Sequence, residues 1–259
     1  MKGFPQRIVC LTEESVEFLY ALEEQDRIVG VSAYARRPCE VVQKPVVTAF
    51  VSGSIKKIKE LNPDLVIGYS DIQKDLARDL VAEGLNVYIA NHRSIKEIFD
   101  YLLFIGRMVD KSALAIELLA KASHKIEEAK AFAKSLKYRP KVYIEEWDEP
   151  LISGIEWFCE VVNLCGGDVV FGDKSINKLA KNRIVSETDF VDIDIDIIFA
   201  CWCGKKVDIK SIQERAYLAR TEAIKNNCIY ELEPEIFLQP GIAPIMAGID
   251  IIIDHLRNY

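Results

Sequence analysis

The segment from Lys111 to Lys137 constrains the fold of this chain more than any other stretch of its sequence. Its residues, KSALAIELLAKASHKIEEAKAFAKSLK, include neither glycine nor proline and are rich in Ala, Glu, Lys and Leu. These residue types favour a helix, and one unbroken helix of this length would extend roughly 40 Å at 1.5 Å per residue. That is longer than a simple crossover between neighbouring strands requires, so we expect a stiff connecting helix.

Short apolar runs alternate with amphipathic stretches on both sides of this segment. The runs predict buried strands, and the stretches between them, with apolar residues three and four apart, predict helices. This alternation indicates crossover connections and parallel sheets. The predicted strands are RIVCL, RIVGVSAY, DLVIG and NVYIA before the segment and KVYIEEW, DIDIIFACW and CIYELEP after it. The predicted helices of the C-terminal part are 157–167, which ends with Gly166 and Gly167 as its cap, 209–226, and one that begins near Ala243-Pro244.

The expected fold class is therefore α/β, with two lobes, one long α-helix between them and a ligand cleft between the lobes. The N-terminal α/β lobe would take residues 1–110, the connecting backbone helix 111–137 and the C-terminal α/β lobe 138–259.

Composition and charge limit the partners and the location of the chain. A net charge of −7 argues against general nucleic-acid affinity, which needs clustered Lys and Arg. No apolar run is long enough for a membrane span, and the N-terminus lacks a secretory pattern. The seven cysteines are odd in number and show no spacing typical of a disulfide framework, which favours a reducing compartment. We expect a cytoplasmic protein; the alternative is a periplasmic or cell-surface protein whose leader has been removed.

Several motifs in this layout resemble the helical-backbone (class III) substrate-binding proteins of ABC transporters, a family that includes vitamin B12-binding and siderophore-iron-binding proteins. The motifs cover nearly the whole chain, and their order and spacing carry the resemblance. They are RIVCLTEESVEFLYALEEQDRIVGVS, IKKIKELNPDLVIGYS, VVNLCGGDVVF, DIDIDIIFA and LQPGIAPIMAGIDII. EEWDEPLISGIEWF and CWCGKK lie outside the general pattern and resemble a signal-less, cobalamin-binding-protein-like subgroup.

The resemblance implies two Rossmann-like lobes that capture a ligand between them without chemistry. The ligand would be a corrinoid or a metal chelate such as a siderophore complex, which can carry its own cobalt or iron. An ABC permease is the implied partner, and family members meet it through an acidic residue on each lobe. The matching positions here are Lys56 and Leu238 or Gln239, none of them acidic, so any permease would dock through a non-standard interface.

Loops at the carboxyl ends of parallel strands are the expected ligand contacts, because α/β sheets usually bind there. Phe50 falls where the resemblance places an aromatic that stacks on the ligand. The predicted ligand-binding residues are Tyr34, Arg36, Phe50, Tyr69, Asp71, Glu146, Trp147, Asp148, Trp202 and Gln239.

Trp147 and Trp202 each follow a predicted strand, so they could hold a flat ligand between two rings; packing within a lobe is the alternative. Glu145–Glu149 places four acids around Trp147. They could recognise amine, amide or cationic groups, or form a solvated loop. A cytosolic enzyme that uses these acids for general acid/base catalysis is the alternative function.

Cys201 and Cys203 are too few for a metal site, and no nearby His completes one. Alternation along a strand end would also point the two thiols to opposite faces. We therefore predict no cofactor or metal bound by the protein itself. A nucleotide-dependent enzyme is disfavoured because CLTEES, after the first strand, holds no glycine.

Overall fold

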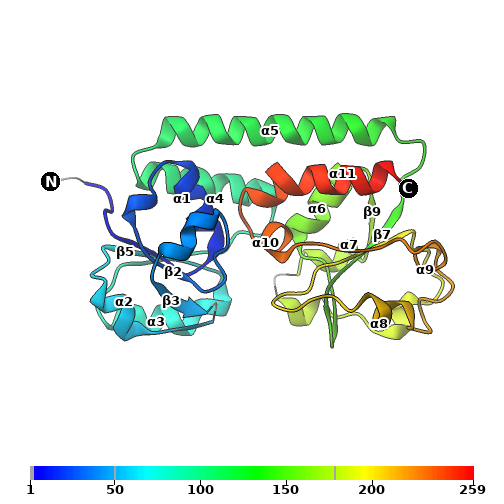
Figure 1. Ribbon diagram of the computed structural model, residues 1–259, viewed down its shortest axis with the longest axis horizontal. Helices are drawn as coiled ribbons and strands as arrows, with labels where there is room; N and C mark the ends of the chain where they lie inside the picture. Colours follow the sequence, from blue (N-terminus) through cyan, green and yellow to red (C-terminus); the bar gives the residue numbers. More distant parts are fainter. Residues whose placement is uncertain (1–2, 50, 178) are drawn as a thin grey trace. The chain divides into compact units, whose positions relative to one another are not determined.

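The computed structural model describes residues 3–49, 51–177 and 179–259, and the chain separates into two compact units. Unit 1 contains the residues up to His92 together with Lys96–Lys121. Unit 2 contains Arg93–Ile95 and Ala122–Tyr259. Each unit has its own mainly parallel β-sheet with helices packed on it (Figure 1), which confirms the α/β class predicted from the sequence.

The long segment is one continuous helix, α5, from Ser112 to Ser135. The prediction of an unbroken helix is confirmed, with ends within two residues of those expected. Helix-favouring Ala and Leu dominate it, and spaced acid–base pairs such as Lys121–Glu117, at 2.7 Å, support its exposed side. The two compact units divide the chain inside this helix, after Lys121, and not at its ends.

The sheet of unit 1 has the strand order β4-β3-β2-β1-β5-β6, and all its pairs are parallel except β3 with β4. The middle strand β1 is fully buried, in keeping with a parallel strand covered on both faces. The strands are β1 Ile8–Cys10, β2 Ile28–Ser32, β3 Val46–Ala49, β4 Ser52–Gly53, β5 Leu65–Tyr69 and β6 Val87–Ala90.

Helices lie on both faces of this sheet (Figure 1). On one face, Ile58 and Leu80 of α2 and α3 join a core cluster with Val9 of β1. On the other face, Tyr88 of β6 packs on Phe104 of α4, with ring centroids 4.7 Å apart. The helices are α1 Glu13–Ala21, α2 Ile55–Glu60, α3 Lys74–Ala82 and α4 Ile95–Met108.

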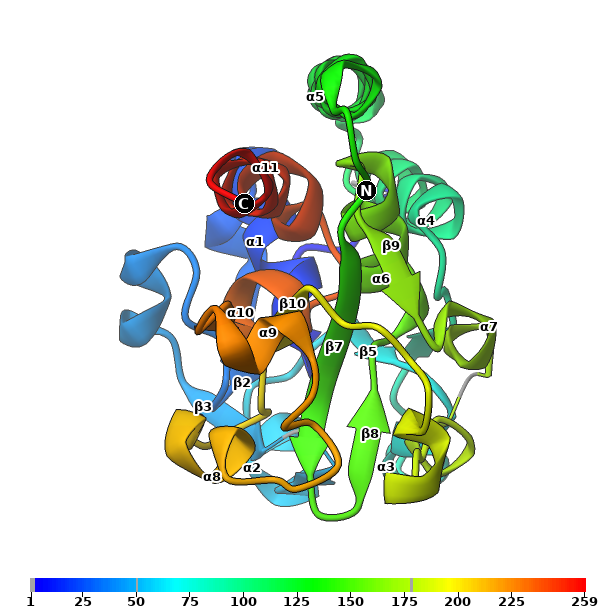
Figure 2. The same cartoon turned by 90° about the vertical axis from the view of Figure 1, so that its right-hand side faces the viewer.

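The sheet of unit 2 has the order β11-β10-β7-β8, with β9 also paired to β7. The long strand β7 therefore has β9 beside its first half and forms an antiparallel hairpin with β8 at its second half (Figure 2). The strands are β7 Lys141–Asp148, β8 Leu151–Ser153, β9 Asp168–Val170, β10 Ile197–Ala200 and β11 Ile229–Glu231.

The two faces of this sheet are covered by different elements. Ile212 of α8 and Ala223 of α9 pack with Tyr143 and Ile198 on one face. On the other face, His255 of α11 lies against the ring of Phe199 at 5.6 Å. The helices are α6 Glu156–Leu164, α7 Gly172–Ser175, α8 Ile209–Gln213, α9 Glu222–Lys225, α10 Pro234–Phe237 and α11 Ile249–Arg257, which follows a π-helical turn at Pro244–Gly248.

Most predicted elements are present, but the helix predicted over 209–226 is wrong in its middle. α8 ends at Gln213, and α9 begins only at Glu222, after Thr221 caps it by accepting a hydrogen bond from a backbone N–H. Between them Arg215 reaches a buried acid, and Leu218 enters the core. Tertiary contacts therefore override the helical pattern.

The short strands β3, β8 and β9 were also not predicted. Each has three or four residues. The predicted end of the helix over 157–167 is confirmed: α6 stops at Leu164, and Gly166 follows with a φ of +100°.

Candidate functional site

The carboxyl-terminal ends of β7 and β10 bring together Trp147, Asp148 and Trp202, three of the predicted ligand residues of unit 2. The two strands are parallel neighbours, and Ala200, the last residue of β10, pairs with Glu145. β7 continues beyond this pair to Trp147 and Asp148, and Trp202 follows β10. The two strands therefore end side by side at one edge of the sheet, a pairing that was not predicted from the sequence.

Glu145 forms a buried ion pair at this edge. Its side chain is fully buried, and its carboxylate accepts hydrogen bonds from both terminal nitrogens of Arg215, at 2.5 and 3.1 Å. The indole N–H of Trp202 donates to the same carboxylate at 3.1 Å. Burial raises the pKa of Glu145 while Arg215 acts to lower it. This network therefore fixes the position of Trp202.

Glu146 points to the opposite face of the strand and pairs with another arginine. Arg183 donates to its two oxygens, at 2.6 and 3.0 Å, and also to the backbone oxygen of Ser153. The Arg183 side chain is only 2% exposed. Glu146 is thus paired with a buried cation and is not available alone to a ligand. The sequence did not reveal that Arg183 is its partner.

Lys205 joins three of the predicted residues into a group that we call the Lys205 cluster: Lys205, Trp147, Trp202 and Asp148. The Lys205 ammonium lies over the ring of Trp147, 4.4 Å from its centroid, and over the ring of Trp202, 4.7 Å from its centroid. It also pairs with the carboxylate of Asp148 at 2.6 Å. A single cation therefore contacts two aromatic faces and one acid.

The Lys205 cluster limits the predicted role of the two tryptophans, which was to hold a flat ligand between their rings. Trp147 is half-buried, and its indole N–H donates to the backbone oxygen of Glu149 at 2.9 Å. Trp202 is only 2% exposed and belongs to a core cluster. The position over both rings is taken by the ammonium of Lys205, so a flat ligand reaches both only when that side chain moves.

Gln239 follows α10 and is half-buried. Its side-chain oxygen is buried and has no hydrogen-bond partner among the described residues. A buried amide oxygen without a donor is unfavourable, so this atom is suited to accept a hydrogen bond from a bound molecule or water.

The predicted residues of unit 1 differ in their surroundings. Tyr69 is buried, and its hydroxyl donates to the backbone oxygen of His92 at 2.9 Å, which marks a packing role. Tyr34, Arg36 and Asp71 are exposed near the carboxyl ends of β2 and β5. The predicted stacking residue Phe50 lies outside the described residues.

Sequence reasoning missed a buried acid at this edge of unit 1. Glu14, in the first turn of α1, accepts hydrogen bonds from the hydroxyls of Thr12 at 2.7 Å and Tyr101 at 3.4 Å. Its second oxygen has no hydrogen-bond partner among the described residues. Burial, together with the charge of Glu13, raises the pKa of Glu14 to about 8. The signal that could have indicated this buried acid is the pair Glu13 and Glu14, which begins three residues after the fully buried central strand β1.

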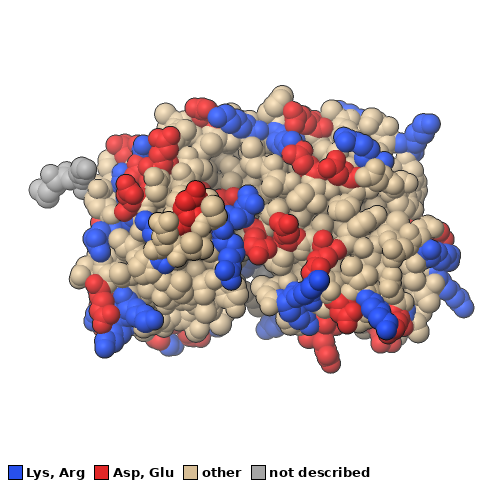
Figure 3. All heavy atoms as spheres, viewed as in Figure 1, with Lys and Arg blue, Asp and Glu red and all other residues tan. Residues whose placement is uncertain are grey.

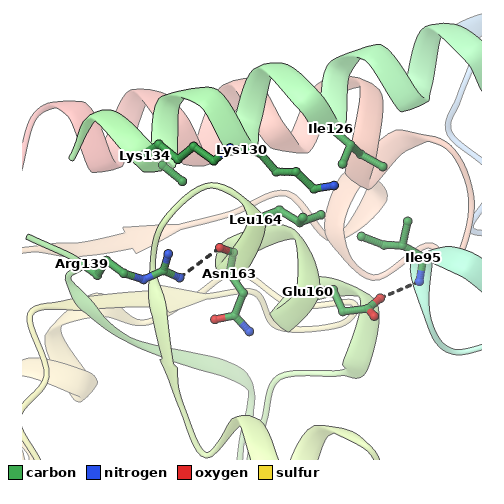
Figure 4. Close-up of a pocket in the computed structure, with 9 residues that line it drawn as sticks. Ile95, Ile126, Lys130, Lys134, Arg139, Glu160, Asn163 and Leu164 are labelled. Atoms are coloured by element: carbon green, nitrogen blue, oxygen red, sulfur yellow. Dashed lines mark hydrogen bonds between the residues drawn. The ribbon is translucent and has the colours of Figure 1, made fainter.

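Two cavities lie within unit 2, and none of the predicted ligand residues that the structure describes lines them. One, of about 650 Å³, lies between α5 and α6 (Figure 4). Lys130, Lys134 and Arg139 line it, and Arg139 donates to the backbone oxygen of Asn163 at 3.2 Å. The other, of about 820 Å³, is bordered by 190–196 and by residues near Tyr217.

On the face shown in Figure 3, acidic and basic side chains are interspersed over each unit, unlike the one-sign surface of nucleic-acid binding proteins. Within the part of the chain that the structure describes, no helix combines the length and apolar character of a membrane span. The same residues bring no three His, Cys, Asp or Glu side chains together as a metal site.

Known proteins share both the sequence pattern and the fold of this chain. The chain is 27% identical over 252 residues to the vitamin B12-binding protein of Vibrio cholerae, covering 92% of this chain and 85% of that protein. A possible iron-binding (periplasmic solute-binding) protein from Staphylococcus epidermidis superposes with a TM-score of 0.81 and 21% identity, over 98% of this chain and 99% of that one.

A periplasmic heme-binding protein from Roseiflexus sp. superposes with a TM-score of 0.80 and 20% identity, over 97% of this chain and 98% of that one. These two likenesses establish the fold. The sequence pattern of the periplasmic binding protein family matches residues 8–236, which is most of the chain. This chain therefore belongs to the periplasmic binding protein family.

Proposed function

We propose that this substrate-binding protein of the ABC-transporter type captures a corrinoid or another metal chelate without changing it chemically. The relatives described above carry names that refer to vitamin B12, iron and heme, all of them metal-containing ligands. The observation that carries the proposal is Trp147, a half-buried aromatic at the carboxyl end of β7, where α/β sheets bind their ligands.

The chemistry of this sheet edge fits a large, partly flat ligand. Trp147 supplies contact area at little entropic cost, because an indole has two side-chain torsions. Asp148 would supply a polar contact at this edge, and the side-chain oxygen of Gln239, which follows α10, is a further hydrogen-bond acceptor in unit 2. In unit 1, Tyr34 and Arg36 are exposed near the carboxyl end of β2. That both units share one ligand is a prediction from the sequence, and it remains one.

The alternative of an acid/base enzyme finds no support in the geometry of Glu145–Glu149. Glu145 is fully buried and accepts two hydrogen bonds from Arg215, and Glu146 accepts two from Arg183. A general acid or base must reach a substrate proton, and neither carboxylate is placed to do so without losing its arginine. We therefore do not propose a catalytic role for Glu145 or Glu146.

Delivery to an ABC permease is part of the proposal, through an interface that differs from the usual acidic contacts. Lys56, at the position expected to be acidic, is 87% exposed on α2. The solved relatives named above are periplasmic, and they favour a periplasmic or cell-surface location over the cytoplasmic one expected from the sequence.

Isothermal titration of the full chain with cyanocobalamin, cobinamide, hemin and a ferric siderophore tests this function. We expect saturable one-to-one binding of at least one of them, with the ligand recovered unchanged. Trp147→Leu should weaken that binding at least tenfold, and Phe4→Leu, at an exposed aromatic near the N-terminus, should leave it unchanged. The absence of saturable binding by all four ligands, or the appearance of a product, would contradict the proposal.

A further inference from the structure

We propose that the Lys205 cluster is a cation-selecting subsite, in which the ammonium of Lys205 is an internal occupant that a positively charged group of the ligand replaces. The inference rests on the proposed function and specifies the charge of the ligand that this edge of unit 2 accepts. It starts from the contacts of Lys205 and from the contrast between this lysine and the two arginines nearby.

The geometry of the cluster is that of an aromatic site for a cation. The Lys205 ammonium lies 4.4 Å from the ring centroid of Trp147 and 4.7 Å from that of Trp202, within the range in which ring faces attract cations. Asp148 adds a carboxylate at 2.6 Å. Two electron-rich faces and one acid form a position whose electrostatics require a positive charge, whichever molecule supplies it.

Lys205 is held far less firmly than the two arginines of the same edge. Its side chain is 41% exposed, whereas those of Arg215 and Arg183 are 14% and 2% exposed. Each arginine makes two hydrogen bonds to one carboxylate, and Lys205 makes one. Lys205 also has a long flexible stem and follows Gly204, whose φ of +78° marks a turn. The arginines are therefore fixed, and Lys205 is exchangeable.

The charges of the edge determine what can replace Lys205. Arg215 neutralises Glu145 and Arg183 neutralises Glu146, so Lys205 is the cation that neutralises Asp148. A neutral or anionic ligand that displaces Lys205 leaves Asp148 partly buried without a cation. A cationic ligand exchanges one positive charge for another and keeps both the ring contacts and the ion pair.

This argument narrows the ligand class of the proposed function. A flat ligand with a net positive charge is preferred, such as a corrinoid that lacks the nucleotide phosphate. Anionic ligands of similar shape, including heme with its propionates and anionic ferric siderophores, are disfavoured at this subsite. We expect a discrimination of about tenfold, which corresponds to about 1.4 kcal/mol.

Small flat probes that differ in charge test the subsite directly. Tryptophan fluorescence of the full chain is titrated with N-methylquinolinium, a cation, and with 1-naphthoate, an anion of similar size. We expect the cation to bind about tenfold more tightly. Asp148→Asn should abolish most of this preference. Equal affinity for the two probes would overturn the inference.

Two adjacent lysines provide a matched pair of variants. Lys205→Met removes the internal cation and should tighten binding of N-methylquinolinium about tenfold, while Lys206→Met, at the exposed neighbouring residue, should change it less than twofold. Equal effects of the two substitutions would overturn the inference, as would the failure of N-methylquinolinium to bind the Lys205→Met variant.

Chemical labelling distinguishes failure of this inference from failure of the proposed function. Acetylation of Lys205 and Lys206 by acetic anhydride is compared by mass spectrometry. Lys205 should react several times more slowly than Lys206 in the protein alone, and N-methylquinolinium at saturation should remove that protection. If corrinoids and chelates do not bind but these results are obtained, the proposed function fails and the subsite stands. If a corrinoid binds while Lys205 stays protected, the function stands and the inference fails.

Discussion

Glu14 in unit 1 and Glu145 in unit 2 occupy comparable places, but the buried carboxyl group is accommodated differently in each. Each is a buried acid at the carboxyl-terminal edge of a parallel sheet. Glu145 has Arg215 beside it, whereas Glu14 receives hydrogen bonds from hydroxyl groups, and its pKa is raised to about 8. In unit 2 the buried carboxylate is stabilised by an ion pair, whereas in unit 1 the buried carboxyl group is stabilised by being protonated.

The difference has consequences for stability. A protonated acid is neutral, so Glu14 is tolerated in the core only while the pH stays below its raised pKa. A paired acid is tolerated over a wide pH range, but only while its partner arginine is present. The stability of unit 1 should therefore depend on pH, and the stability of unit 2 on the presence of its partner arginine. The following predictions test this contrast.

The largest expected effect is that of Arg215→Met, which leaves Glu145 buried without a cation. We expect unit 2 to lose about 3–5 kcal/mol of its free energy of unfolding at pH 7. Tryptophan fluorescence during urea unfolding is the measurement, because Trp147, Trp157 and Trp202 all lie in unit 2.

The control for this prediction is Arg220→Met, at an exposed arginine five residues further along, which should change little. The double variant Glu145→Gln with Arg215→Met should recover part of the loss, since it removes the unpaired charge. If Arg215→Met destabilises no more than Arg220→Met, the ion pair does not support this edge.

The next effect concerns Glu14 and pH. Because its folded pKa of about 8 lies above the ordinary value of 4.5, its contribution to stability is fully present below pH 4.5 and is lost as the pH rises toward 8. Glu14→Gln removes this penalty and should stabilise unit 1 by about 1–3 kcal/mol at pH 8, with little change at pH 4.5. Hydrogen exchange of the β1 amides, corrected for intrinsic rates, is the measurement.

Glu60→Gln, at an exposed acid on α2, is the matched control and should not alter the pH dependence. A wild-type unit 1 that is equally stable at pH 4.5 and pH 8 would show that Glu14 is not kept protonated.

The smallest effect is expected for Lys205→Met. The pair with Asp148 is 41% exposed on the lysine side, so its loss should destabilise unit 2 by less than about 1 kcal/mol. Added salt should weaken this contribution, while the buried pair of Arg215 and Glu145 should respond less. Urea unfolding of Lys205→Met and Arg215→Met at low and high salt makes the comparison. A loss as large as that of Arg215→Met would mean that Lys205 is a fixed structural cation.

The sequence predicted those features that depend on local pattern. The Ala-rich composition of 111–137 predicted α5, and the apolar runs before Trp147 and Trp202 predicted a strand before each of them. The partners of the acids could not be predicted in this way. Arg183 and Arg215 lie 37 and 70 residues from the glutamates that they bind. Such pairs are set by tertiary packing, and no local spacing encodes them.

The same reason explains the partial prediction of the site. Trp147 and Asp148 were identified from their place at a strand end, but the contact of Lys205 with both tryptophans depends on how a turn folds back over them. Glu14 lies in the first turn of α1, a place usually exposed, and its burial follows from the packing of Tyr101 against it.

The central claim, that a ligand binds at the carboxyl-terminal edge of unit 2, is tested most directly by the indole N–H signals of the three tryptophans in a ¹H–¹⁵N NMR titration with diamagnetic cobinamide. Trp157 is an internal control, because it is buried and donates to the backbone oxygen of Phe237 at 2.8 Å. We predict that the Trp147 and Trp202 signals shift and saturate at one equivalent while the Trp157 signal stays in place. Saturable binding of cobinamide that leaves Trp147 and Trp202 unshifted would contradict the account.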